Sequence, residues 1–122
     1  MGESLVKVVV TGGAGFIGSN LGRELLARPD VNEVVALDDL STGNRSNLDG
    51  TGIRLFEGTI LDPEALDATC EGADAVVHLA AIPAPGLQPN AKTFSNNVTA
   101  TYNVFEACRI AGVHRQLLLI GL

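Results

Sequence analysis

The chain has few of the residues on which several protein classes depend. Among its 122 residues are two cysteines, Cys70 and Cys108, with no Cys-x-x-Cys pair or Cys/His cluster, so neither a disulfide framework nor a metal site is expected. Its 8 lysines and arginines lie singly and are outnumbered by 14 acidic residues, which disfavours nucleic acid and anionic membranes as partners. No apolar run approaches the length of a membrane span. The N-terminus lacks the pattern of a signal peptide, so we expect a cytoplasmic protein.

Short apolar runs alternate with segments of helical spacing, in a chain whose length favours a single domain. The runs predict strands at residues 5–10, 33–37, 53–57, 75–79 and 116–122. The other segments predict helices at residues 16–28, 63–70 and 91–111. Asp62 with Pro63 is typical of a helix start, and Gly112 of a helix end. This alternation predicts an α/β fold with a parallel sheet and helices on both faces.

Two of the predicted helices carry apolar stripes. Ile17, Leu21 and Leu25 recur at helical spacing in the first of them. The stripe of the long third helix consists of Val98, Tyr102, Phe105 and Ile110. We expect the two histidines to play no catalytic part, His78 as a satisfied core residue of a strand and His114 as a solvated turn residue.

The strongest local signal is the segment TGGAGFIG at residues 11–18, which follows a predicted strand and opens a predicted helix. Glycines 13, 15 and 18 satisfy G-x-G-x-x-G, a pattern that lets the backbone approach a pyrophosphate and presents helix N–H groups to it. An ordinary glycine-rich turn is the bland alternative. A Walker-type phosphate loop is excluded, because Ser19 stands where its lysine would have to be.

Asp38 strengthens the dinucleotide interpretation. It ends the second predicted strand, twenty residues beyond Gly18, where a carboxylate accepts hydrogen bonds from the adenosine ribose. Asp39 and Leu40 follow it rather than an arginine, so NAD is favoured over NADP. We therefore predict a Rossmann-type sheet of about five strands, in the order 3-2-1-4-5, with NAD as its cofactor.

Several longer segments together resemble the extended short-chain dehydrogenases/reductases, in particular nucleotide-sugar epimerases and dehydratases of the UDP-glucose 4-epimerase type. The resembling segments are VTGGAGFIGSNL (10–21), LDDLSTG (37–43), EGTILD (57–62), DAVVHLAA (74–81), NNVTAT (96–101) and EACRIAGVHR (106–115). They cover nearly the whole chain up to Arg115, in the order that the family has.

The resemblance implies a set of cofactor-binding residues. Those expected at the pyrophosphate are Gly12, Gly15, Phe16, Ile17 and Gly18. Those expected at the adenosine half are Asp38 on the ribose, with Asp39, Ser41, Thr42 and Gly43 beside it. Thr59 and Ile60 stand where the family usually has Asp-Ile against adenine, and Thr59 offers no carboxylate. Those expected along the nicotinamide-side ribose are Leu79, Ala80 and Ala81, with Asn97 near them.

The resemblance also implies what these 122 residues lack. The family's chemistry uses a Ser or Thr after the fifth strand and a Tyr followed four residues later by a Lys. Tyr102 is the only tyrosine here, with Glu106 four residues on, and Gly121 stands about where the catalytic Ser is expected. We therefore assign no catalytic residue, and expect a truncated epimerase-type protein whose residues 1–122 form an NAD-binding domain without the substrate-binding part.

Three functions are compatible with this pattern. The first is the NAD(H)-binding part of an epimerase/dehydratase that acts on nucleotide sugars by transient hydride transfer and is inactive alone. The others are an enzyme completed by a partner chain and a regulatory module that binds NAD(H) without turnover. An open edge at the fifth strand also predicts a homo-oligomer.

Overall fold

The computed structural model describes residues 6–80 and 90–118. In chain order its elements are β1 (Val6–Thr11), α1 (Phe16–Leu26), β2 (Val31–Asp38), the 3-10 helix η1 (Arg45–Leu48), β3 (Arg54–Glu57), α2 (Pro63–Cys70), β4 (Ala75–His78), α3 (Asn90–Ala111) and β5 (Arg115–Leu118). Within this part of the chain, none of the helices combines the length and apolarity needed to cross a membrane.

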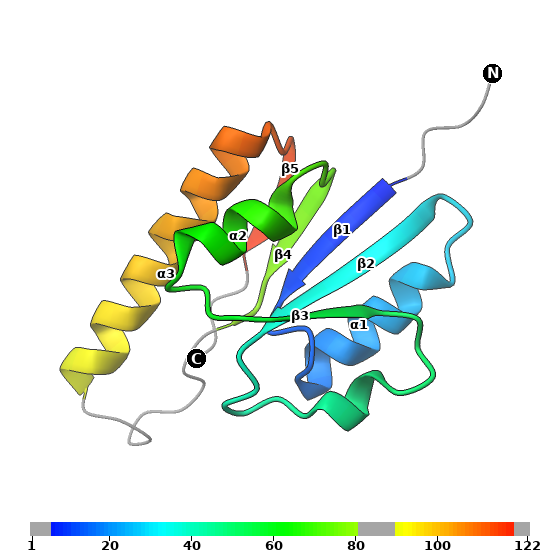
Figure 1. Cartoon of the computed structure of the whole chain (residues 1–122), viewed down its shortest axis with the longest axis horizontal. Coiled ribbons are helices and arrows are strands. Elements are labelled where there is room, and N and C mark those ends of the chain that lie inside the picture. Colours follow the sequence, from blue (N-terminus) through cyan, green and yellow to red (C-terminus); the bar gives the residue numbers. More distant parts are fainter. Residues whose placement is uncertain (1–5, 81–89, 119–122) are drawn as a thin grey trace.

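The five strands form one parallel sheet in the order β3-β2-β1-β4-β5 (Figure 1). This confirms the predicted fold class and strand order. The order reverses at β1, whose neighbours are β2 on one side and β4 on the other. In open parallel sheets, ligands bind beyond the carboxyl ends of the strands at such a reversal, so the fold itself marks the end of β1 as the place to look for a site.

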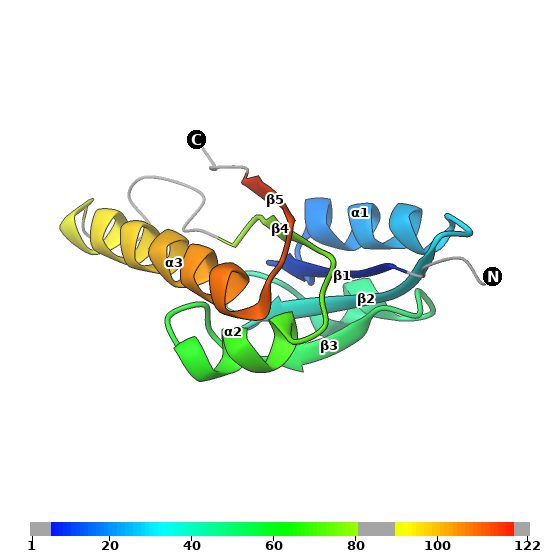
Figure 2. The same cartoon turned by 90° about the horizontal axis from the view of Figure 1, so that it is seen from above.

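Helices cover both faces of the sheet, as Figure 2 shows. Alternate β1 residues point to opposite faces: Val8 and Val10 pack towards Leu21 and Leu25 of α1, whereas Val9 packs towards α2 and α3. The strands therefore consist of nearly continuous apolar residues, because both of their faces are buried.

The predicted caps are confirmed. The Asp62 side chain accepts a hydrogen bond from the backbone N–H of Glu64 at 3.0 Å, and Pro63 is the first residue of α2. Gly112 follows α3 with φ of +73°, and the next residue, Val113, donates its N–H to the Cys108 carbonyl at 2.9 Å. A left-handed residue at this place ends a helix while satisfying its last carbonyls, and glycine adopts that conformation without strain.

Some element boundaries differ from those predicted. The first helix ends at Leu26 rather than at residue 28. The first residue of its predicted apolar stripe, Ile17, is 66% exposed because it lies at the loop end rather than over the sheet. The second strand begins at Val31, two residues early. The predicted loop between β2 and β3 contains η1, which Asn44 caps by accepting the Ser46 N–H at 2.9 Å. The fifth strand is described as far as Leu118, and the rest of its predicted range lies outside the described residues.

The predicted apolar stripe of the long helix does not face the core. Val98, Tyr102, Phe105 and Ile110 are all exposed, Tyr102 to 64%. The buried face of α3 consists instead of the small residues Ala100, Val104, Ala107 and Cys108. Small side chains let α3 lie close to α2 and β4, and the bulky residues are left on the outer face. Both cysteines are free and buried, as predicted.

Candidate functional site: the carboxyl end of the parallel strands

The loop between β1 and α1 is a tight turn held by backbone hydrogen bonds. Gly12 has φ of +74° and donates its N–H to the Leu37 carbonyl of β2 at 2.8 Å. Gly15 donates to the Gly12 carbonyl at 3.1 Å, and the Gly15 carbonyl in turn accepts the Ser19 N–H at 3.0 Å. The chain thus leaves the strand, reverses and enters α1 within four residues, with a positive φ at Gly12 that favours glycine.

Packing requires glycine at three positions of this segment. A Cβ on Gly12 would lie 3.0 Å from the backbone N of Ala80 at the end of β4. A Cβ on Gly18 would lie 2.4 Å from the carbonyl oxygen of Gly12 and 2.8 Å from the Cα of Gly13. Gly18 therefore allows the first turn of α1 to rest directly on the loop. Gly13, which we did not assign to the site, is needed as well, because its Cβ would meet that of Ala36 at 2.5 Å.

Packing within the chain constrains Gly15 less than it constrains these three glycines. A Cβ there would meet one described atom within 4 Å, the Gly12 carbonyl oxygen at 3.3 Å, and its φ of −79° suits any residue. Gly15 precedes α1 directly, and among the described residues no side chain caps this helix end. The missing side chain leaves open the space in front of the N-terminal N–H groups of α1, where an anionic group is stabilised.

Asp38 connects this loop to the loop that follows β2. Its Oδ2 accepts the backbone N–H of Ala14 at 2.9 Å, and its Oδ1 accepts that of Leu40 at 2.8 Å. A carboxylate has about four acceptor positions, so these two bonds leave acceptor capacity for a ligand hydroxyl. Asp38 is 8% exposed. A Cβ on Gly43 would lie 2.8 Å from Asp38 Oδ2, so glycine at that position gives the carboxylate its room.

Two asparagines that we did not assign from the sequence, Asn47 and Asn44, donate hydrogen bonds to Ala14 of the glycine loop. Asn47 donates its side-chain N–H to the Ala14 carbonyl at 2.8 Å, and the Asn44 backbone N–H donates to the same oxygen at 3.0 Å. A polar side chain in a turn-rich segment is too common a feature to have revealed this role. Leu40 has φ of +64°, an uncommon conformation for a residue with a side chain, and it packs on the small core cluster around Ala14.

A second network fixes the ends of β1 and β4 to each other. The Thr11 hydroxyl oxygen accepts the backbone N–H groups of Leu79 at 3.0 Å and of Ala80 at 3.1 Å, and it lies 2.6 Å from His78 Nδ1. Since both lone pairs of the hydroxyl are occupied, its proton is donated to Nδ1, and the imidazole carries its own proton on Nε2. Burial lowers the pKa of His78, which favours this neutral form. His78 is buried as expected, and His114 is exposed.

The remaining predicted residues differ in how far they are buried. Phe16 is 80% exposed beside the loop. Asp39 is also exposed, and its Oδ1 accepts hydrogen bonds from the backbone and the hydroxyl of the exposed Ser41. Half-buried positions are occupied by Thr59 and Ile60 after β3, Leu79 and Ala80 after β4, and Asn97 on α3. Thr42 is exposed, and Ala81 lies outside the described residues.

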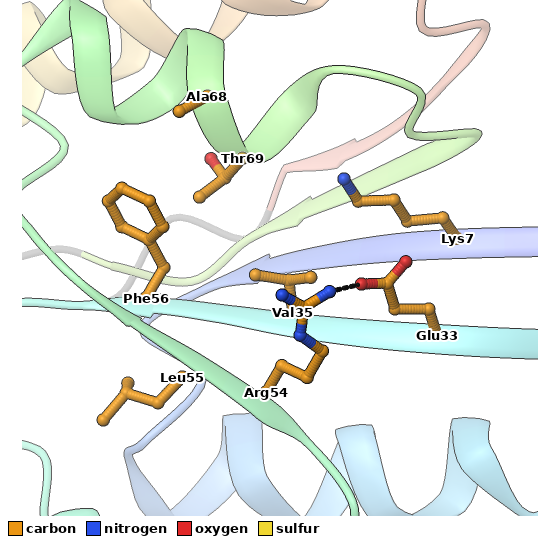
Figure 3. A pocket seen from close by; sticks show the side chains of 8 residues that line it. All are labelled: Lys7, Glu33, Val35, Arg54, Leu55, Phe56, Ala68 and Thr69. Atoms are coloured by element: carbon orange, nitrogen blue, oxygen red, sulfur yellow. Dashed lines mark hydrogen bonds and ion pairs between the residues drawn. The ribbon is translucent and has the colours of Figure 1, made fainter.

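A separate hollow of about 100 Å³ lies at the opposite end of the sheet, under α2 (Figure 3). Its lining residues are Lys7, Glu33, Val35, Arg54, Leu55, Phe56, Ala68 and Thr69. Its cations are already engaged, since Arg54 pairs with Glu33, and Lys7 Nζ donates to the Glu71 carbonyl at 2.8 Å. In the described ranges, no group of three potential metal-ligating side chains occurs. The carboxyl end of the strands is therefore the candidate site.

Comparison with known proteins agrees with this geometry. The model of the family described as "NAD dependent epimerase/dehydratase family" matches residues 8–121. The chain belongs to this family. The family match includes the glycine loop, Asp38 and the Thr11–His78 network.

Individual members of the epimerase/dehydratase family are similar to about nine-tenths of the chain. The UDP-glucose 4-epimerase of Erwinia amylovora is 36% identical in an alignment of 120 positions that covers 90% of this chain and 35% of that protein. The structure of UDP-glucose 4-epimerase from Brucella ovis in complex with NAD is 37% identical, with a TM-score of 0.80 over 93% of this chain and 35% of that one. A dTDP-glucose 4,6-dehydratase from Streptomyces venezuelae with NAD bound is 38% identical, with a TM-score of 0.80 over 91% and 38%. This chain therefore spans about a third of the length of these relatives.

Proposed function

We propose that residues 1–122 form the NAD(H)-binding domain of an epimerase/dehydratase that acts on nucleotide sugars by transient hydride transfer. The observation that carries the proposal is Gly15, which precedes α1 directly and at which an added Cβ would meet one described atom within 4 Å, the Gly12 carbonyl oxygen at 3.3 Å. A pyrophosphate placed there would accept hydrogen bonds from backbone N–H groups and would be stabilised by the helix dipole.

The other predicted residues fit the remaining parts of the dinucleotide. Asp38 has the free acceptor capacity that the adenosine ribose hydroxyls require, and its negative charge disfavours the 2′-phosphate of NADP. The segment of Leu79 and Ala80, held against Gly12 by Thr11, would pass along the nicotinamide-side ribose, with Ala81 and Asn97 near it. Bound NAD would supply the hydride acceptor, while this chain binds and orients it.

We propose that the chain alone is inactive. Its sequence has no tyrosine followed four residues later by a lysine, and it corresponds to about a third of the relatives that carry out the complete reaction. Incubation with NAD⁺ and UDP-glucose is expected to give no UDP-galactose. Epimerisation by the isolated chain would contradict this part of the proposal, and activity that appears only on mixing with a second protein would favour a partner-completed enzyme.

Calorimetric titration with NAD⁺, and with NADP⁺ for comparison, tests the binding function. We expect saturable binding of NAD⁺, its loss in Gly15→Val and its weakening in Asp38→Ala. Asn32→Ala is a matched control, because Asn32 is exposed near the start of β2, at the opposite end of that strand from Asp38. If the folded wild-type chain binds no NAD⁺, the proposal is wrong and the glycine loop is architecture alone.

We also propose that the chain forms homo-oligomers. The outer face of α3 exposes Phe94, Val98, Tyr102 and Phe105 at spacings of four, four and three residues, which makes a continuous apolar stripe along the helix. A second copy of the chain would bury this stripe by packing its own α3 against it. Light scattering is expected to report a dimer for the wild type and a monomer for Val98→Glu, whereas a monomeric wild-type chain would contradict the proposal.

A cytoplasmic location is the last part of the proposal. Cys70 and Cys108 are both free and buried in one core cluster, which suits a compartment that keeps thiols reduced. Protein purified without reductant is expected to show two free thiols after denaturation. Recovery of a native disulfide would contradict this location.

A further inference from the structure

One side chain of α3 is bonded to the loop that joins β3 to α2. Asn103 donates from its Nδ2 to the carbonyl oxygen of Ile60 at 3.1 Å, across 43 residues of sequence. Asn103 is half-buried and borders the packed face of the helix, where Val104 is 3% exposed. Ile60 itself packs against the core cluster to which Val104 belongs. The Asn103 amide therefore connects α3 to a loop whose residue Ile60 already contacts the same core cluster.

The other hydrogen bonds that the described residues make in this loop do not reach α3. Gly58 donates its N–H to the Asp38 carbonyl at 3.1 Å, which ties the start of the loop to β2. Asp62 donates its N–H to the Thr59 carbonyl at 3.0 Å, and Leu61 donates to the Thr59 hydroxyl at 3.1 Å, so both of these bonds are local. Among the described residues, the bond from Asn103 connects this loop to α3, and we therefore take it as the tie between them.

The position of the loop gives this bond a functional meaning. The phosphates of a dinucleotide would lie in front of α1, after β1, and the adenosine ribose would lie at Asp38, after β2. The next strand outwards is β3, so the adenine would extend towards residues 58–62. The Gly58 bond to Asp38 places this loop directly beside the ribose-binding residue. The conformation of residues 58–62 would therefore determine the shape of the part of the site where adenine binds.

We infer that Asn103 is a positioning residue for the adenosine half of the cofactor, which it does not touch itself. This inference rests on the proposed binding of NAD(H). The amide holds the Ile60 carbonyl and thereby keeps the loop in its binding conformation before the ligand arrives. Without the bond, part of the population has the loop elsewhere, and the apparent affinity falls by the fraction that is lost.

Two variants of the full chain test the inference. Asn103→Ala removes the amide, and Asn103→Asp keeps the shape but replaces the donor with a carboxylate facing a carbonyl. A hydrogen bond of this kind is worth about 0.5–1.5 kcal/mol, so we expect both variants to bind NAD⁺ about 2- to 12-fold more weakly. ADP, which keeps the adenosine and the diphosphate, should lose affinity by the same factor. Thr99→Ala, an exposed position one turn earlier on α3, is the control and should bind as the wild type does.

Hydrogen exchange separates positioning from general destabilisation. In the ligand-free variants, the amides of residues 58–61 should exchange faster, while those of α1 keep their wild-type rates. Equal affinity of the wild type and both variants for NAD⁺ would overturn the inference and leave the proposed function intact. A weaker affinity with faster exchange throughout α1 and the sheet would also overturn it, as a purely structural effect. No binding by the wild-type chain would instead overturn the proposed function, and the inference with it.

Discussion

The hydroxyl of Thr11 donates to Nδ1 of His78 across the junction of β1 and β4, with 2.6 Å between the two atoms. The same hydroxyl accepts two backbone N–H groups from the segment that leaves β4. One buried side chain thus fixes the tautomer of an imidazole and the path of the chain next to Gly12. β1, at which the strand order reverses, is thus joined to its neighbour β4 at the end of the sheet where the site lies.

Replacement of Thr11 is expected to destabilise the fold strongly. Thr11→Val keeps the shape of the side chain but leaves the Ala80 amide and the imidazole nitrogen without their partner, whereas the Leu79 N–H still has the Thr11 backbone carbonyl at 3.1 Å. Because buried polar groups are costly to leave unpaired, we expect a loss of about 2–4 kcal/mol in the free energy of unfolding. Thr11→Ser retains the hydroxyl and should lose about 1 kcal/mol for its missing methyl group. Urea denaturation measures both values, and similar losses in the two variants would show that the hydroxyl is not the stabilising group.

The buried imidazole predicts a dependence of stability on pH. Burial lowers the pKa of His78 from its usual value of 6.5, so the unfolded chain takes up a proton at a higher pH than the folded chain does. The contribution of neutral His78 to the free energy of unfolding is therefore fully present above pH 6.5, and it is lost as the pH falls towards the pKa of His78 in the folded chain. The free energy of unfolding should fall by up to about 1.4 kcal/mol per pH unit in that window.

His78→Asn is the matched variant for this dependence. Asparagine can place its side-chain oxygen close to the position of Nδ1 and accept the Thr11 proton, but it does not titrate. The difference in unfolding free energy between wild type and His78→Asn should therefore change between pH 7.5 and pH 5.5. A difference that stays constant over this range would show that His78 titrates alike in the folded and unfolded chains.

The fold could be predicted from the sequence because its signals are local and repeated. Apolar runs of strand length recur between helical segments, and each βα unit brings its own turn chemistry, such as Asp62 before Pro63. The direction of the α3 stripe could not be predicted, because helical periodicity identifies an apolar face without saying what covers it. In this chain the small residues Ala100 and Ala107 face the core, and Tyr102 and Phe105 face outwards.

The candidate site was predictable only where residue type and position act together. Gly12, Gly18 and Asp38 stand in a spacing that has a direct steric and hydrogen-bonding reason, and the structure supplies that reason. Asn47 and Asn103 bind single carbonyl groups at distances of 33 and 43 residues. Such bonds depend on where the folded chain brings two distant segments together, so the local sequence does not predict them.

We expect a substitution at Gly18 to lower the stability of the fold and a substitution at Gly15 to weaken NAD⁺ binding. In Gly18→Ala, the new Cβ would collide with the backbone of Gly12, so we expect a destabilisation of about 3 kcal/mol. In Gly15→Ala, the Cβ would meet one described atom within 4 Å, the Gly12 carbonyl oxygen at 3.3 Å, and the free energy of unfolding should change by less than about 1 kcal/mol, while NAD⁺ affinity falls at least tenfold. Urea denaturation and calorimetry together test this contrast. A Gly15→Ala chain that binds NAD⁺ normally would remove the reason to place a ligand at this helix end.

The charge of Asp38 is expected to decide between NAD⁺ and NADP⁺. Its carboxylate would accept hydrogen bonds from the ribose hydroxyls and would repel a 2′-phosphate, and the exposed Asp39 adds a second negative charge. Asp38→Ser removes the repulsion while keeping a small hydrogen-bonding group. We expect it to bind NAD⁺ about tenfold more weakly, from the loss of a charged hydrogen bond worth about 1.5 kcal/mol, and to narrow the preference over NADP⁺. Asp39→Ser is the matched control: it should alter the preference less, because Asp39 accepts its hydrogen bonds from Ser41 and does not hold the glycine loop. An unchanged ratio of the two affinities in Asp38→Ser would mean that the ribose does not lie at this carboxylate.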